Sequence, residues 1–328
     1  MNRIKNILSL FDGISCGRVA LEKSNIKINK YYASEINKDA IEVSKSNWND
    51  IVQLGDINNW KQWDIDWKSI DLLIGGSPCQ GFSFAGKQLN FEDERSKLFF
   101  TFVDILNHIK KLNPNVKFLL ENVKMKKEYQ NIISEYLGVE PININSSLVS
   151  AQLRNRFYWC NWKVEQPQDK GILLKDILEK GYTDREKSRC ILESESRPLK
   201  TKDKIINRYF TVGFSTIIFK DKDLSDYAKQ KIKERLKDER PIAFNWFNTK
   251  MLNDKSATLI ANDGWSGKGT TMIIEDDDIR YLNQLELERL QTLPEGYTKS
   301  VNRNKAAGLI GNGWTVDVIS HIFNELIG

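Results

Sequence analysis

Short apolar runs with β propensity alternate with helical patterns along the first half of the chain, and this alternation restricts the fold more than any other feature. Strands that alternate with helices form mostly parallel sheets, because each crossover helix packs against a face of the sheet. The sequence therefore predicts an α/β fold with a mostly parallel sheet and helices on both faces. The expected strands are residues 7–10, 31–33, 52–54, 72–74 and 118–120.

Helical periodicity is clearest over residues 97–111, where apolar side chains recur at spacings of three and four residues and Pro114 follows the predicted end. Periodicity returns over 285–293 and 315–326. Between these regions the pattern becomes charged and irregular, with one amphipathic helix expected over 226–238. We therefore predict a large domain over 1–161, a smaller domain over 162–272, and a C-terminal segment over 273–328 that completes the large domain.

Composition excludes several classes of protein. The chain of 328 residues is long enough to bury a core without disulfides or structural metals. Its four cysteines show no CxxC spacing and it has only two histidines, so we expect neither a disulfide framework nor a metal site. No apolar run approaches the roughly 18 residues of a membrane span, and we expect a cytoplasmic protein without membrane contact. A formal net charge of +5 permits a nucleic-acid partner without establishing one.

Acidic residues near the ends of the early strands indicate a nucleoside pocket. Residues 8–17 read as a strand, a glycine turn and a helix start, but they lack the G-x-G-x-x-G sequence of dinucleotide-binding proteins. Glu35 ends the second strand, where a carboxylate accepts hydrogen bonds from ribose, and Asp56 follows the third strand as an acceptor for an adenine amino group. Because no phosphate-binding loop is present, S-adenosylmethionine fits better than NAD or ATP. Its carboxylate needs only the amides of a helix N-terminus.

Cys79 is the candidate nucleophile, because it follows a buried apolar strand in the sequence Gly-Gly-Ser-Pro-Cys-Gln-Gly-Phe-Ser-Phe. A thiol there lies at the carboxyl edge of the sheet, where open α/β folds carry their chemistry. Glu121 follows a later strand and should lie on the same edge, as a capping or ion-paired residue or as a carboxyl that burial keeps protonated. Arg154 and Arg156 occupy alternate positions, which predicts that both lie on one face of a strand. Surface ion pairs are the other interpretation of these arginines.

These residues occur in the order of the DNA cytosine-5 methyltransferase motifs, and the sequence resembles that family over both ends of the chain. The early blocks are Asp12-Gly13 with Gly17, Glu35, Asp56, Pro78-Cys79-Gln80, Glu121-Asn122-Val123 and Gln152-x-Arg154-x-Arg156. The last blocks are Glu286-x-x-Arg289-Leu290-Gln291-x-x-Pro294 and Gly311-Asn312-Gly313-Trp314. The small size, the block over 8–17 and the tryptophan after Asn312-Gly313 are most similar to the phage and bacterial members and the eukaryotic de novo enzymes.

The resemblance implies a Rossmann-like, S-adenosylmethionine-dependent methyltransferase fold with a smaller target recognition domain. It implies that Cys79 adds to C6 of a cytosine so that C5 can accept a methyl group, with Glu121 neutralising charge on the ring. Arg154 or Arg156 would hold the base carbonyl or a phosphate, and Asn122 would orient the loop. The product would be S-adenosylhomocysteine, with no metal. The expected cofactor-binding residues are Phe11, Asp12, Gly13, Ile14, Ser15, Gly17, Glu35, Ile36, Asp56, Ile57, Ser77, Pro78, Leu98, Asn312 and Trp314.

A duplex buries the target carbon, so the resemblance implies that the cytosine is flipped out of double-stranded DNA. We expect residues 80–97 to form a mobile lid over the base. The smaller domain should read the major groove, with the basic run over 185–208 contacting phosphates. We expect a monomer, with a cognate restriction endonuclease as a candidate partner. The expected DNA-binding residues are Gln80, Phe82, Ser83, Lys87, Arg95, Arg185, Arg189 and Arg197.

Three other functions share part of this pattern. A tRNA cytosine-5 methyltransferase has the same fold and catalytic blocks, but its Cys-Phe-Thr signature is absent, since Asn-Trp follows Cys160 and Ile-Leu follows Cys190. A catalytically silent DNA-binding relative would not need the intact Cys79, Glu121 and Arg154. A cysteine hydrolase would need a histidine base, and neither histidine lies at the end of a predicted strand.

Overall fold

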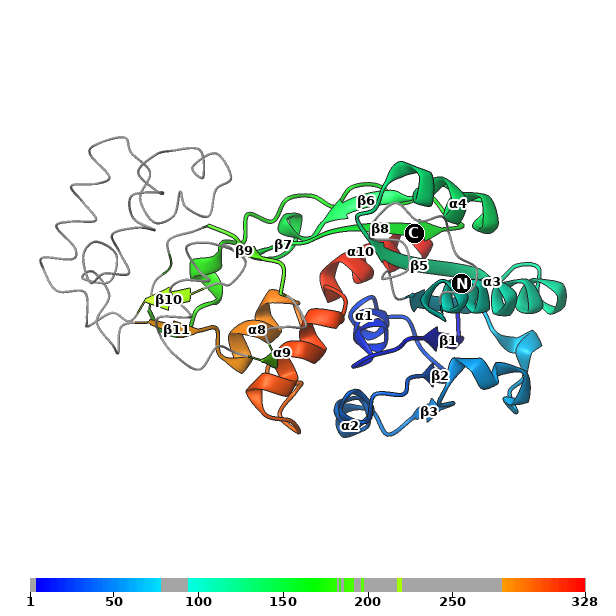
Figure 1. Cartoon of the computed structure of the whole chain (residues 1–328), viewed down its shortest axis with the longest axis horizontal. Helices are drawn as coiled ribbons and strands as arrows, with labels where there is room; N and C mark the ends of the chain where they lie inside the picture. Colours follow the sequence, from blue (N-terminus) through cyan, green and yellow to red (C-terminus); the bar gives the residue numbers. More distant parts are fainter. Residues whose placement is uncertain are drawn as a thin grey trace, which may run out of the picture.

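A seven-stranded sheet forms the centre of the structure (Figure 1), a computed structural model that describes residues 4–77, 94–181, 183, 186–191, 196–197, 217–219 and 279–327. The strands lie in the order β3-β2-β1-β4-β5-β8-β6. All five strands expected from the sequence are present. The bounds are β1 Asn6–Leu10, β2 Lys30–Ser34, β3 Ile51–Gln53, β4 Leu72–Gly76, β5 Lys117–Val123, β6 Ile142–Asn145 and β8 Asn155–Cys160.

Strands β3, β2, β1, β4 and β5 run parallel, which confirms the predicted α/β fold with a mostly parallel sheet. Leu8 in β1 pairs with Tyr32 on one side and with Leu73 on the other. The remaining strands differ, because β8 runs antiparallel to both β5 and β6. As a consequence, the carboxyl ends of the five parallel strands meet along one edge of the sheet.

Helices cover both faces of the sheet, as the alternating pattern predicted. Ile7 and Leu8 belong to different buried clusters, because successive side chains of a strand point to opposite faces. The cluster around Ile7 includes side chains of α1 (Cys16–Lys23), α2 (Lys38–Asn47) and α10 (Val316–Ile327). The cluster around Leu8 includes side chains of α3 (Glu94–Leu112), α4 (Lys127–Leu137) and the 3-10 segment η1 (Ile57–Gln62), with η2 (Trp67–Ser69) packed beside them.

The two ends of the chain meet at α1 and α10. The hydroxyl of Ser24, directly after α1, lies 2.8 Å from that of Ser320 in α10. The helix predicted over 315–326 is present as α10, and the one predicted over 285–293 is present as α8 (Gln284–Leu290). Helix α8 ends before its predicted limit as the chain turns toward Thr292, whose φ of 54° lies in the left-handed region. Helix α9 (Arg303–Asn312) follows and leads to the sheet edge.

Residues 162–178, which the sequence placed at the start of the smaller domain, pack against the core of the large one through Trp162 and Leu174. Most of 162–272, including the helix expected over 226–238, lies outside the described residues, so the division into domains stays a prediction.

Two short ladders and two 3-10 segments complete the described elements. β7 (Gln152–Leu153) pairs parallel with β9 (Ser188–Arg189), and β10 (Ile217–Phe219) pairs antiparallel with β11 (Ile279–Tyr281). The 3-10 segments are η3 (Ser146–Leu148) and η4 (Leu174–Ile177). Among the described residues, no helix has the length and apolar character needed to cross a membrane.

Candidate active site

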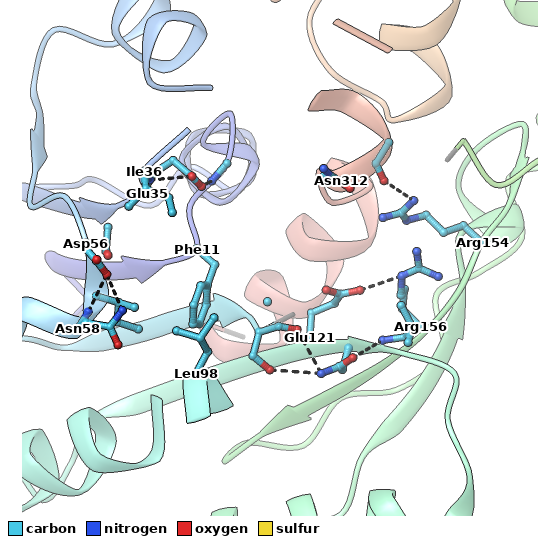
Figure 2. A pocket seen from close by; sticks show the side chains of 18 residues that line it. Phe11, Glu35, Ile36, Asp56, Asn58, Leu98, Glu121, Arg154, Arg156 and Asn312 are labelled. Carbon is cyan, nitrogen blue, oxygen red and sulfur yellow. Dashed lines mark hydrogen bonds and ion pairs between the residues drawn. The ribbon is translucent and has the colours of Figure 1, made fainter. Parts of the chain in front are cut away.

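A cavity of about 520 Å³ opens at the edge where the parallel strands end (Figure 2). Its walls come from the ends of β2, β4 and β5, from the turn after β1, and from α9 near the other end of the chain. The cavity therefore joins the residues predicted for the cofactor to those predicted for the target base. The predicted residues that line it are Phe11, Gly13, Glu35, Ile36, Asp56, Ile57, Ser77, Leu98, Glu121, Asn122, Arg154, Arg156 and Asn312.

The turn after β1 positions one wall of the cavity. Phe11, Gly13 and Ser15 have positive φ values of 56°, 58° and 61°, so the chain reverses tightly between β1 and α1. The carboxyl of Asp12 accepts hydrogen bonds from the hydroxyls of Ser15 and of Tyr31, the latter at 2.7 Å. Burial raises the pKa of Asp12 to about 6. Four residues predicted to bind the cofactor shape this turn and the start of α1 without lining the cavity: Asp12, Ile14, Ser15 and Gly17.

Two carboxylates mark the cofactor side of the cavity. Glu35 accepts backbone hydrogen bonds from Gly13, Ile36 and Asn37, each at 2.8 Å, and so ties the end of β2 to the turn after β1. Asp56 accepts from the backbone N–H of Asn58 at 2.9 Å, which caps η1 with one carboxylate oxygen. The side chain of Ile36 is 71% exposed although it is large and apolar. An exposed apolar side chain beside two carboxylates suits a flat apolar ligand with polar edges.

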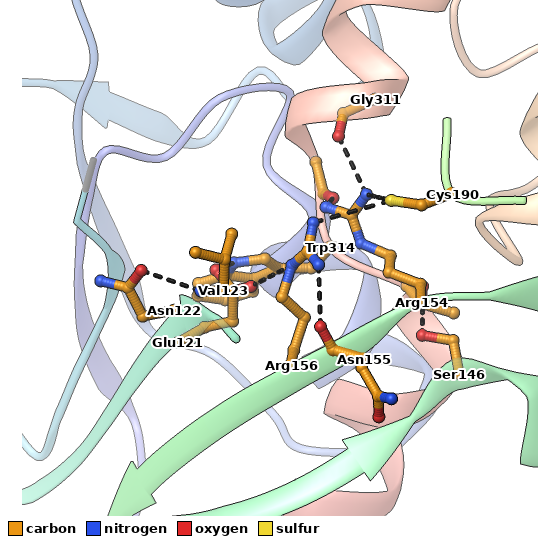
Figure 3. A network of polar contacts seen from close by, with 12 residues as sticks. Glu121, Asn122, Val123, Ser146, Arg154, Asn155, Arg156, Cys190, Gly311 and Trp314 are labelled. Carbon is orange, nitrogen blue, oxygen red and sulfur yellow. Dashed lines mark hydrogen bonds and ion pairs between the residues drawn. The ribbon is translucent and has the colours of Figure 1, made fainter. Parts of the chain in front are cut away.

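Glu121 lies at the end of β5 with only 9% of its surface exposed, and an ion pair and a hydrogen bond hold its carboxylate (Figure 3). The Nε atom of Arg156 lies 2.9 Å from Oε1 in an ion pair, and the indole N–H of Trp314 donates to Oε2 at 3.2 Å. Burial alone would lower the pKa of Arg156, but the neighbouring carboxylate of Glu121 raises it above its usual value. Of the interpretations offered by the sequence for Glu121, the ion-paired one therefore agrees with this arrangement.

Asn122 holds Ser77, two residues before Cys79 in the sequence. Its side chain is almost fully buried, and its Nδ2 donates to the carbonyl and the hydroxyl of Ser77 at 3.3 and 3.2 Å. Its Oδ1 accepts from the backbone N–H of Val123 at 2.8 Å. Asn122 therefore connects the ends of β4 and β5. Several predicted site residues that follow in the sequence lie outside the described residues: Pro78, Cys79, Gln80, Phe82, Ser83, Lys87 and the side chain of Arg95.

The expectation that Arg154 and Arg156 share one strand is wrong, because the strand is interrupted at Arg154 between β7 and β8. Arg154 is 4% exposed, and its guanidinium donates to the carbonyls of Gly311 and Gly313 at 3.0 and 2.9 Å. It also donates to the sulfur of Cys190 at 3.1 Å. Arg154 thus anchors the end of α9, whereas Arg156 pairs with Glu121 inside the cavity.

The residues predicted to contact DNA are only partly described. Arg189 lies in β9, and Arg197 is exposed, whereas Arg185 lies outside the described residues. Lys187 belongs to the predicted basic run, but its ammonium group donates to the carbonyls of Ser147 and Ser150 at 2.8 and 3.1 Å, and to a third carbonyl at residue 172. The ammonium group of Lys187 therefore forms hydrogen bonds within the protein.

Sequence reasoning missed a buried pair of glutamines beside the arginines. Gln152 accepts from the backbone N–H of Ile191 at 3.1 Å and donates to the side chain of Gln291 at 3.3 Å. Gln291 in turn donates to the carbonyl of Gly313 at 3.1 Å. Both glutamines stood in the motif blocks, but nothing in their spacing showed that they contact each other. They join β7, the residues after β9 and the C-terminal blocks.

β8 is the one antiparallel strand of the seven-stranded sheet, and the cavity lies at the edge where the parallel strands end. Together with the strand order, these features define an α/β fold of the methyltransferase type. A crystal structure of a Spodoptera frugiperda DNMT2 variant has this fold, with a TM-score of 0.64 and 19% sequence identity over 99% of this chain and 100% of that one. At this identity the likeness shows the fold alone.

The C-5 cytosine-specific DNA methylase family matches residues 5–328, and the chain belongs to that family. The type II methyltransferase M.NgoBV of Neisseria gonorrhoeae is 35% identical over 176 residues, which cover 52% of this chain but only 39% of that protein. The type II methyltransferase M.NgoBI of the same species is 29% identical over 318 residues, covering 95% of this chain and 90% of that protein. The predicted family and fold are thus confirmed. Members of this family are enzymes that use S-adenosylmethionine.

Proposed function

We propose that the protein methylates C5 of cytosine within a specific short sequence of double-stranded DNA, using S-adenosylmethionine, base flipping and covalent addition of Cys79 to C6. The observation that carries this proposal is the continuous cavity, which joins the carboxylates of Glu35 and Asp56 to the Glu121–Arg156 pair. A methyl donor and a target base must meet in one water-poor space, and this cavity offers walls suited to each.

The residues of the cofactor side fit S-adenosylmethionine. Ile36 and Phe11 offer apolar surface to an adenine ring, and Ile36 in particular exposes surface that is costly to leave in water. Glu35 retains one of its roughly four acceptor sites for a ribose hydroxyl after accepting its three backbone bonds, and Asp56 can accept from the adenine amino group with its second oxygen. When bound, the cofactor supplies an electrophilic methyl group. Among the described residues no cluster could hold a metal ion.

The chemistry begins with the thiolate of Cys79. C5 of cytosine is a weak nucleophile, and addition of sulfur to C6 turns C5 into an enamine carbon that can attack a sulfonium methyl. Loss of the C5 proton to a base, for which water suffices, then allows elimination of Cys79. Asn122 supports this step by holding Ser77, two residues before the nucleophile.

Glu121 and Arg156 would stabilise the flipped base during that addition. A carboxyl at the end of β5 can share a proton with N3 of the ring, and the guanidinium of Arg156 both orients that carboxyl and can reach a base carbonyl or a phosphate. Of the two arginines considered, the contacts favour Arg156 for this role, because Arg154 already donates to two carbonyls.

The DNA-binding parts of the proposal rest on the sequence. The segment over 80–93, which lies outside the described residues, would close over the base, whereas residues 94–97 of the predicted lid belong to α3, so that part of the prediction is wrong. The region over 162–272 would read the major groove, with Arg185, Arg189 and Arg197 as candidate DNA contacts. The curated relatives are named type II methyltransferases. A cognate restriction endonuclease, a monomeric state and a cytoplasmic location follow as parts of the same proposal.

Two alternatives have weaker support. Methylation of tRNA is compatible with the fold, but the likeness to a solved structure at 19% identity carries no argument about the substrate. A silent DNA-binding role leaves the buried Glu121–Arg156 pair beside the cavity without a purpose, and buried ion pairs rarely add stability by themselves.

Bisulfite sequencing of plasmid DNA from cells expressing the protein tests the proposed function. We expect protected cytosines in one fixed short context, and none when Cys79→Ala replaces the wild type. Lys127→Ala is a control, since this exposed residue of α4 lies outside the cavity and outside the region proposed to read DNA, and it should leave protection unchanged. Absence of protected cytosines with the wild-type protein would refute DNA methylation, and bisulfite sequencing of tRNA from the same cells would then test the second candidate.

A further inference from the structure

Trp314 was expected to bind the cofactor, but it does not line the cavity, and its indole N–H points to Glu121 instead (Figure 3). The indole Nε1 lies 3.2 Å from Oε2 of Glu121, while Arg156 occupies Oε1 at 2.9 Å. We propose that Trp314 is a positioning residue for Glu121: it holds the carboxylate in one orientation through the oxygen that Arg156 does not contact. This inference deepens the proposed function and rests on it for its consequence in catalysis.

The space around the pair leaves the carboxylate little freedom to turn. A Cβ atom at Gly76 would lie 2.9 Å from Oε2 of Glu121 and 3.0 Å from Nε1 of Trp314. The first distance is shorter than real Cβ contacts and the second is tighter than most of them, so any side chain at Gly76 would displace Glu121 or Trp314. The end of β4 therefore packs directly against the hydrogen bond between Trp314 and Glu121.

Hydrogen bonds hold the residues on both sides of Trp314, so the fold positions the indole before any ligand enters the cavity. The carbonyl of Gly313 accepts from Arg154 at 2.9 Å and from Gln291 at 3.1 Å. The hydroxyl of Thr315 donates to the Oε1 of Gln291 at 2.6 Å. A donor fixed in this way before substrate arrives needs no reorganisation during the reaction.

Arg156 and Trp314 act on different oxygens of Glu121, and together they hold its carboxylate in one orientation. Replacing Trp314 by Phe keeps an aromatic ring but removes the hydrogen-bond donor, so the carboxylate should turn more freely.

The first test needs neither DNA nor methyl donor. Of the nine indole signals of a protein labelled with 15N-tryptophan, Trp314→Phe identifies one. We expect Glu121→Gln to move that signal more than any other indole signal, because the acceptor loses its charge while its shape is kept. Glu140→Gln is the matched control, since Glu140 is exposed and pairs only loosely with Lys127 at 3.8 Å. A Trp314 signal that responds no more to Glu121→Gln than to the control would overturn the proposal.

The second test follows methylation by the full chain. We expect Trp314→Phe to lower the single-turnover rate about tenfold or more, since one preorganised donor is lost. The affinity for S-adenosylmethionine should stay unchanged, so that the loss appears in the rate alone. Weaker cofactor binding with an unchanged single-turnover rate would show that Trp314 serves the cofactor and would contradict our proposal. If the wild type methylates no DNA, the proposed function fails. The shift of the Trp314 indole signal in Glu121→Gln still tests the hydrogen bond between Trp314 and Glu121 in that case.

Discussion

At the scale of single residues, the turn after β1 holds the carboxyl of Asp12 largely out of water. Burial raises the pKa of Asp12 from 3.8 to about 6, against hydrogen bonds from Ser15, Ser9 and Tyr31 that lower it. The folded chain therefore binds a proton at Asp12 that the unfolded chain releases between pH 3.8 and about 6. Protonated Asp12 therefore contributes to the free energy of unfolding below this pH range, and the contribution is lost as pH rises through the range. At neutral pH the free energy of unfolding is lower by on the order of 3 kcal/mol for this reason.

Asp12→Asn should remove this pH dependence. The amide keeps an oxygen that accepts from Tyr31, and its NH2 group can donate to Ser15, whose hydroxyl also lies 2.6 Å from that of Ser44. We expect the free energy of unfolding of the variant to exceed that of the wild type above about pH 6 and the two to converge near pH 4. Urea unfolding across this range measures the difference, with the exposed Asp64→Asn as control. Parallel curves for Asp12→Asn and wild type would contradict a buried, titrating Asp12.

At the scale of elements, the junction between β7 and β8 separates two arginines that their spacing had placed together. Arg154 leaves the strand and binds the end of α9, and Arg156 re-enters the sheet and reaches Glu121. A guanidinium can bridge two carbonyls because its donors diverge in one plane, and an ammonium group cannot reproduce that fork. The same substitution should therefore have different consequences at the two positions.

Arg154→Lys should lower the free energy of unfolding by about 1–3 kcal/mol, because it leaves buried carbonyls of Gly311 and Gly313 short of a donor. Arg156→Lys should change stability less and lower the methylation rate more, since its guanidinium faces the cavity. Chemical denaturation and single-turnover methylation of the two variants give the comparison. A stability loss confined to Arg156→Lys would reverse our assignment of the two roles.

The same elements show what the sequence could and could not predict. The strand ends carrying Glu35 and Glu121 could be predicted to meet, because parallel strands all end at one edge. The partners of Arg154 could not, since Gly311 and Gly313 lie 157 and 159 positions away and the spacing rule assumes an unbroken strand. The role of Trp314 was hidden for the same reason. Its contact with Glu121 spans 193 positions and depends on how β4, β5 and the C-terminal block pack.

At the scale of the whole molecule, the chain closes on itself where α10 packs against α1. Asp317, in the first turn of α10, pairs with Lys23 of α1 and with Lys170 at 2.8 Å. Burial alone would raise the pKa of Asp317, but the two ammonium groups lower it below its usual value. For a carboxyl with a lowered pKa, the stabilising contribution is present at neutral pH and is lost as pH falls through the folded pKa.

Asp317→Asn should lower the free energy of unfolding by about 2 kcal/mol at neutral pH, because one partner of a partly buried ion cluster is removed. The difference from wild type should shrink in acid, where Asp317 of the wild type is itself protonated. Asp39→Asn is the matched control, since Asp39 also lies in the first turn of a helix but pairs with Lys305 at an exposed site, where a loss below about 0.5 kcal/mol is expected.

The comparison also tests whether the C-terminal segment completes the large domain. Side chains of α10 and β1 belong to one buried cluster, so loss of Asp317 should move a single unfolding transition, seen alike by tryptophan fluorescence and by far-ultraviolet circular dichroism. If Asp317→Asn instead produced an early transition in which α10 separates while the parallel sheet stays folded, the segment over 273–328 would be a docked appendage. Its contribution of Asn312 and Trp314 to the cavity region would then depend on that docking.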